Sequence, residues 1–183
     1  MKLTAYLRFQ IIVVLILSSV FLSSCGKEEY PQSSLFIRDS LLYKKDSNVP
    51  FTGKEKAKVK DKIVEYEVKD GYKNGEFKIY NLQGVLEISG QLDSNRNVGK
   101  WQYFYPNGVV ESEGNFDCDL PDGNWYWYYP DGKKKEEGIF SKGKRVGIWY
   151  QYDREGKVTL KKHFDSDSVP IEQQDSLGYK SRN

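Results

Sequence analysis

The stretch GNWYWYYPDG, residues 123–132, places two Trp and three Tyr between two glycines and ends in a Pro-Asp-Gly turn. Aromatic residues favour β-strands, whereas Pro fixes φ and Gly tolerates a positive φ, as a tight turn requires. Because side chains alternate along a strand, the rings divide between two faces: Trp125, Trp127 and Tyr129 on one, and Tyr126 and Tyr128 on the other. The stretch therefore predicts a strand with rings on both faces, followed by a hairpin turn.

This stretch is one unit of a repeat with a period of 24 residues. Glycines begin successive units at Gly75, Gly99, Gly123 and Gly147, and a second glycine follows each one nine residues later. A ring stands two places after each first glycine, at Phe77, Trp101, Trp125 and Trp149. A third glycine recurs at Gly90, Gly114 and Gly138 and is replaced by Lys162 in the last unit. Agreement at so many positions without an insertion indicates a repeat architecture.

Each unit predicts one β-hairpin. A ring-rich first strand runs into a turn such as Pro106-Asn107-Gly108, and the second strand returns antiparallel to the first. Polar loops, such as 93–98 and 141–146, are expected to connect one hairpin to the next. The third glycine of each unit should leave a gap in which a ring of a neighbouring strand lies over bare backbone. A lone hairpin is marginally stable in water, so the hairpins must pack on one another.

The expected fold is therefore all-β, an elongated single-layer antiparallel sheet of stacked hairpins. The repeat domain is expected at 49–164, with a degenerate first unit at 51–74 and then units at 75–98, 99–122, 123–146 and 147–164. Residues 165–183 are rich in Ser, Asp and Gln and are expected to be a disordered tail.

The repeat resembles the variant MORN repeat of bacterial proteins, through Gly99-Lys100-Trp101, Tyr105-Pro106-Asn107-Gly108, Gly114 and Phe116. The resemblance covers about residues 75–164. It implies a sheet of stacked hairpins used in protein or membrane association, and some bacterial members are named as antitoxin components. The last unit departs from the pattern at Lys162 and in the turn Asp153-Arg154-Glu155, as expected of a terminal cap.

The N-terminus predicts export. Lys2 and Arg8 precede an apolar run at 11–22, which is shorter than the roughly 20 residues that a transmembrane helix needs. Leu22-Ser23-Ser24-Cys25 resembles the lipobox of bacterial lipoproteins, which implies cleavage of a signal peptide at 1–24 and lipidation of Cys25. Residues 25–48 are then the lipidated Cys and a tether, in which 35–37 and 41–43 could form a first strand or a short packed segment.

The residues after Cys25 bear on the location of the protein. Gly26 stands where many lipoproteins that stay at the inner membrane have Asp, and Lys27-Glu28-Glu29 looks like a surface-export signal of Bacteroidetes lipoproteins. The resemblance implies a lipid-anchored protein of the cell envelope, at the outer membrane; surface exposure is one alternative, and the sequence does not identify the membrane leaflet. The membrane, reached through the lipid, is the first expected partner.

Composition argues against several classes of function. Without residues 1–24 the chain has 26 basic and 26 acidic residues, so no bulk basic charge favours nucleic acid. His163 is the only histidine, and Cys118 is the only cysteine besides Cys25, which argues against the usual metal sites, a disulfide and a catalytic triad. Residues 138–145 nearly spell a P-loop, but Arg145 stands where Ser or Thr is needed. We expect no enzyme and no cofactor beyond the covalent lipid.

The main hypothesis is a repeat lipoprotein whose stacked hairpins bind another protein. Large, stiff rings suit such a surface, and the candidate binding residues are Trp101, Tyr103, Tyr105, Trp125, Trp127, Tyr129 and Trp149. One alternative is an envelope carbohydrate- or choline-binding module, since 123–128 is similar to choline-binding repeats. A second is an antitoxin-like neutralising protein. The sequence identifies neither the partner nor the oligomeric state.

Overall fold

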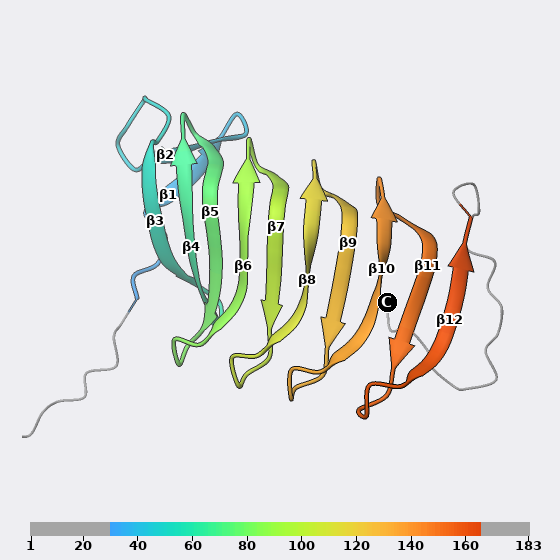
Figure 1. Ribbon diagram of the computed structural model, residues 1–183. Helices are drawn as coiled ribbons and strands as arrows, with labels where there is room; N and C mark the ends of the chain where they lie inside the picture. Colours follow the sequence, from blue (N-terminus) through green and yellow to red (C-terminus); the bar gives the residue numbers. More distant parts are fainter. Residues whose placement is uncertain (1–29, 166–183) are drawn as a thin grey trace, which may run out of the picture. The chain divides into compact units, whose positions relative to one another are not determined.

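The computed structural model describes residues 30–165, which form only β-strands and turns (Figure 1). The strands are β1 (Leu35–Arg38), β2 (Leu41–Lys44), β3 (Gly53–Val59), β4 (Lys62–Lys69), β5 (Tyr72–Asn81), β6 (Leu86–Asp93), β7 (Arg96–Phe104), β8 (Val110–Asp117), β9 (Leu120–Tyr128), β10 (Lys134–Ser141), β11 (Lys144–Tyr152) and β12 (Val158–Phe164). Strands β3 to β12 form one open ten-stranded antiparallel sheet in the order of the sequence, and β1 and β2 form a separate hairpin. The expected all-β sheet of consecutive hairpins is confirmed.

The turns within each hairpin, which we call the wide turns, lie where the Pro-Asn-Gly and Pro-Asp-Gly motifs predicted them. At Tyr105-Pro106-Asn107-Gly108 the Gly108 amide donates to the Tyr105 carbonyl, and Asn107 Oδ1 accepts from the Val109 amide. The last unit lacks Pro and Asn at these positions but keeps the turn, because Asp153 Oδ1 accepts from the amides of Glu155 and Lys157. The acceptor has moved from the third residue of the turn to the first.

The prediction of polar loops at 93–98 and 141–146 is wrong. The chain reverses there in two residues, both with positive φ, and the strands run directly out of the turn. The turn residues are Ser94-Asn95, Cys118-Asp119 and Lys142-Gly143, with φ between 47° and 81°. Such turns match the twist of paired strands, because both central residues adopt the left-handed conformation.

Neighbouring tight turns are joined by hydrogen bonds. The Asp119 amide donates to the Asn97 carbonyl, and the Asn97 amide donates to Asp119 Oδ1 at 2.7 Å. In the next unit Gly143 has no side-chain acceptor, but its partner there is Pro121, which has no amide hydrogen to satisfy. The missing acceptor at Gly143 therefore leaves no donor unsatisfied, because Pro121 has no amide hydrogen to donate.

The hairpin β1–β2 packs on the start of the sheet. Leu42 is buried with Tyr66 and Val68, and Leu35 and Phe77 lie against this cluster. Residues 35–44, which the sequence analysis placed in the tether, thus form a packed hairpin. The signal peptide at 1–24, Cys25 and almost all of the expected tail lie outside the described residues. Within 30–165 no helix is long and apolar enough to cross a membrane.

Candidate functional site

Each central tryptophan lies flat against a glycine of the preceding strand. A methyl group on Gly114 would stand 2.2 Å from Trp125 Cδ2, and the same overlap recurs for Gly90 with Trp101 and for Gly138 with Trp149. The indole nitrogen of Trp125 donates to the Asn115 carbonyl at 3.1 Å. The ring therefore fills the space of the missing side chain and is fixed by a backbone hydrogen bond, as the third glycine predicted.

These rings join into a continuous ladder on one side of the sheet, which we call the ring face. Phe residues stand edge-on between the tryptophans, with centroid distances of 5.3 Å for Phe116 and Trp125 and 5.1 Å for Phe140 and Trp149. In order along the sheet the ladder is Phe77, Trp101, Phe116, Trp125, Phe140, Trp149 and Phe164. Edge-to-face rings attract through their quadrupoles, so the ladder stabilises the sheet along its length.

Burial changes the role of the candidate binding residues. Trp101, Trp125 and Trp149 are only 5%, 5% and 3% exposed, so their rings cannot serve as exposed contacts, contrary to the proposal from sequence. Trp127 is half-buried and contacts the rings of both Trp125 and Trp149. The half-buried Tyr103 lies on the same face, and burial raises the pKa of its hydroxyl.

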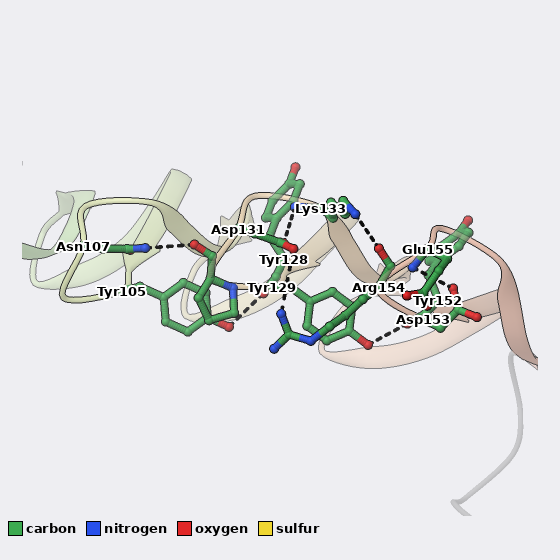
Figure 2. A network of polar contacts seen from close by, with 11 residues as sticks. Tyr105, Asn107, Tyr128, Tyr129, Asp131, Lys133, Tyr152, Asp153, Arg154 and Glu155 are labelled. Atoms are coloured by element: carbon green, nitrogen blue, oxygen red, sulfur yellow. Dashed lines mark hydrogen bonds and ion pairs between the residues drawn. The ribbon is translucent and has the colours of Figure 1, made fainter.

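The remaining two candidates, Tyr105 and Tyr129, lie apart from the ladder, at the edge formed by the wide turns (Figure 2). Tyr105 donates through its hydroxyl to the Tyr128 carbonyl at 2.8 Å, and Tyr129 donates to the Tyr152 carbonyl at 2.7 Å. Arg154 lies over the Tyr129 ring, 5.0 Å from its centroid. Because each hydroxyl reaches into the following unit, these tyrosines connect adjacent hairpins.

The opposite side of the sheet, which we call the polar face, is organised around two glutamates. Glu113 accepts from Lys100 Nζ, Gln102 Nε2 and Tyr128 Oη, and these hydrogen bonds, Lys100 first, lower the pKa of its carboxyl despite partial burial. Burial, followed by the hydrogen bond to Glu113, raises the pKa of Tyr128 to about 12. The polar face therefore has a partly buried charge network with its partners in place.

The same arrangement recurs one unit later. Burial tends to raise the pKa of Glu137, but the hydrogen bonds from Lys134 and Tyr152 outweigh it, and the net shift is downward. The hydrogen bond to Glu137, with burial second, raises the pKa of Tyr152 to about 12. Lys134 Nζ also lies 5.2 Å from the centroid of the Tyr126 ring.

Comparison of equivalent positions shows where the last units differ. The polar-face position of Gln91 becomes Asn115 and then Ile139, and that of Lys100 becomes Asn124 and then Ile148. Ile139 and Ile148 are 44% and 38% exposed. These residues were not predicted from the sequence, although aligning the repeats and comparing equivalent positions would have found them.

The two isoleucines lie in a shallow hollow of about 180 Å³ on the polar face. Tyr126 and Tyr150 stand on either side of Glu137, which pairs with both across neighbouring strands. In the pairing of β10 with β11 the register shifts between Glu137 and Ile139, which places a β-bulge under the hollow. We call the surface formed by Tyr126, Ile139, Ile148 and Tyr150 the apolar hollow.

The other motifs acquire structural roles. The P-loop-like segment 138–145 is the end of β10, a tight turn and the start of β11, with no helix to follow. Cys118 is an exposed free thiol in the first position of a tight turn. Within residues 30–165 no three His, Cys, Asp or Glu side chains are placed to hold a metal ion.

Comparison with known proteins agrees with the hairpin pattern. The family model described as MORN repeat variant matches residues 97–117, 121–142 and 145–166. No curated protein sequence matches the chain. Each matched segment begins at the second residue of the first strand of a hairpin and reaches the end of its second strand. The last three hairpins of the sheet, β7–β8, β9–β10 and β11–β12, therefore each match the MORN repeat variant model.

Proposed function

We propose that this protein is a non-enzymatic repeat protein that binds another protein through its sheet and is held to a bacterial envelope membrane by lipid on Cys25. An array of MORN hairpins fits a protein-interaction module. The central tryptophans are used inside the sheet, so the contact surface lies elsewhere. The apolar hollow is the observation on which the proposal rests.

The apolar hollow has the properties of a protein-binding surface. Its isoleucines are exposed at positions where earlier units have Asn, Gln, Lys or Glu, so the sheet itself does not require them to be apolar. Tyrosines flank them, and tyrosine is enriched where binding energy concentrates in protein interfaces. The hollow is shallow, which suits a side chain presented by a partner better than an enclosed small molecule.

The test replaces the two isoleucines with the residues of the preceding unit. Ile139→Asn with Ile148→Asn copies Asn115 and Asn124, so the sheet should fold unchanged. Residues 26–183 serve as bait for extracts of the bacterial envelope, and the double variant is expected to lose a partner that the wild-type chain retains. A matched control changes Gln91 and Lys100 to Asn on the same face.

Two results would contradict the proposal: no specific partner for the wild-type chain, or equal retention by the double variant. The lipid anchor is tested separately. Full-length chain expressed in a bacterium should incorporate labelled palmitate, and Cys25→Ser should abolish the incorporation. Labelling that persists in Cys25→Ser would exclude Cys25 as the anchor.

The choline- or carbohydrate-binding alternative is weakened by burial. A cage for a quaternary ammonium needs open ring faces, and the faces of Trp101, Trp125 and Trp149 are covered. The half-buried rings of Tyr126 and Tyr150 already have Lys134 and Lys161 over them, and Glu137 between them is paired with Lys134 at 2.7 Å. Choline titration of tryptophan fluorescence would restore this alternative if it gave a saturable change.

A further inference from the structure

The two ends of the sheet differ. At the first edge, β3 is partly covered, because Gln32 bridges to Lys58 and Ser33 donates to Glu55 Oε1 at 2.8 Å. At the last edge, β12 pairs with β11 on one side and, within residues 30–165, with nothing on the other (Figure 1). An edge strand presents every second amide and carbonyl outward, which is a template for another strand.

Strand β12 carries basic side chains but no acidic ones. Elsewhere in the sheet several basic side chains pair with glutamates of the adjacent strand, as Lys54 does with Glu67 at 2.8 Å and Arg145 with Glu136 at 3.2 Å. Residues 156–164 contain Lys157, Lys161, Lys162 and His163 and no acid, and His163 lies 3.0 Å from the carboxylate of Asp165, just after the strand.

The two central lysines of β12 have no carboxylate partner among the described residues. Their Nζ atoms lie over rings instead, Lys161 at 5.8 Å from the Tyr150 centroid and Lys162 at 5.1 Å from the Phe164 centroid. The adjacent strand β11 contains no acidic residue, so carboxylates on an added strand would supply the partners that both lysines lack.

A second copy of the chain is a poor occupant. Antiparallel pairing of two β12 strands would bring the lysine pairs close together, and like charges opposed across strands are destabilising. Pairing of β12 with β3 would oppose lysines again, because β3 contains Lys54, Lys56 and Lys58. The lysines thus keep copies apart and at the same time favour a strand of opposite charge.

We propose that the free edge of β12 binds an extended acidic segment of a partner protein, which adds antiparallel as an eleventh strand. Its backbone would pair with Val158–Phe164, and adjacent carboxylates, one on each face, would meet Lys161 and Lys162. This mode of recognition takes affinity from the main chain and selectivity from the side chains. The edge adjoins the apolar hollow, because Lys161 lies over Tyr150, but the outward main-chain groups of β12 are not part of the hollow and the proposal does not depend on it.

The experiment uses residues 26–183 and two capped peptides, Thr-Val-Glu-Glu-Ile-Thr-Val and the same peptide with Lys-Lys in the centre. Amide NMR shifts and hydrogen exchange locate the binding. The glutamate peptide is expected to slow exchange of the outward amides of β12 by about tenfold or more at saturation, and 1 M salt should weaken it because the Debye length falls to about 3 Å. The double variant Lys161→Glu with Lys162→Glu should prefer the lysine peptide.

A matched control, Lys60→Glu with Lys69→Glu, makes the same charge change far from β12 and should keep the wild-type preference. The proposal is overturned if neither peptide binds, if both bind equally, or if the shifts lie outside β12. It is also overturned if only a chain ending at Asp165 binds, since residues 166–183 would then be the occupant. Loss of the partner in Ile139→Asn with Ile148→Asn bears on the proposed function and not on this edge.

Discussion

Replacing Gly114 with Ala would place a methyl group inside the volume of the Trp125 ring. The new Cβ would lie 2.2 Å from Cδ2 and 2.3 Å from Cε2, well inside van der Waals contact. The backbone at Gly114 does not have a positive φ, so Ala fits the main chain and the whole effect comes from the ring. Because the ring atoms are the rigid part of the side chain, Trp125 must leave its position.

The cost follows from what Trp125 loses. Overpacking of a filled site costs about 1–3 kcal/mol. A displaced indole also loses its hydrogen bond to the Asn115 carbonyl, about 1 kcal/mol net, and its edge-on contacts with Phe116 and Phe140, about 0.5–1.5 kcal/mol each. These losses overlap, so we expect Gly114→Ala to lower the free energy of unfolding by about 3–5 kcal/mol.

Urea unfolding followed by circular dichroism measures this cost in two backgrounds. If the ring is the cause, Gly114→Ala in a Trp125→Ala chain should cost less than about 1 kcal/mol, because the clash has been removed. The position control is Lys162→Ala, at the equivalent position of the last unit, where no tryptophan follows; it should change stability by less than about 0.5 kcal/mol. A cost under about 1 kcal/mol in the wild-type chain, or an equal cost in both backgrounds, would refute the reasoning.

Three further outcomes are expected. Folding lowers the pKa values of Glu113 and Glu137, so the stabilisation they provide is present above the ordinary pKa of 4.5 and is lost as pH falls through the folded value. Changing both residues to Gln should therefore reduce the loss of thermal stability in acid. An unchanged acid profile would count against the network. Asp119→Ala should lower the free energy of unfolding in urea by about 1–2 kcal/mol, because it removes the acceptor for the Asn97 amide at a position with φ of 70°. Asp119→Asn keeps an acceptor and should lower it by less than about 0.5 kcal/mol. Equal costs for the two variants would be inconsistent with this account. Ultraviolet titration should show Tyr152 ionising near pH 12, so its stabilising contribution persists below pH 10 and is lost above the raised value; Tyr152→Phe should remove one such late step, and a single transition near pH 10 for all tyrosines would contradict the hydrogen bond.

The repeat period made much of this fold predictable. The recurring spacing of Gly114 and Trp125 pairs a glycine, which leaves a gap on the strand, with a ring that can fill it. The Pro-Asn-Gly turn fixes one end of the hairpin. The tight turns were harder, because Ser94-Asn95, Cys118-Asp119 and Lys142-Gly143 share no residue type. What they share is a backbone conformation. The residue types favour this conformation only weakly, and the pairing of the flanking strands determines it.

The division between buried and exposed rings was not predictable from composition. Trp125 and Tyr126 are neighbours, and both faces of the strand carry rings, so alternation alone does not show which face is covered. The glycine opposite Trp125 decides it, because a flat ring is buried only where the neighbouring strand has no side chain. Ile139 was overlooked for a different reason: its unusual character appears only by comparison with Asn115.

The stacking of tryptophan on glycine is tested most directly by proton NMR of the glycines themselves. The Hα protons of Gly90, Gly114 and Gly138 lie under indole rings and should be shifted well upfield, with nuclear Overhauser contacts to the rings of Trp101, Trp125 and Trp149 respectively. Glycine Hα shifts at ordinary values, without contacts to those rings, would contradict the central claim that these rings hold the sheet together.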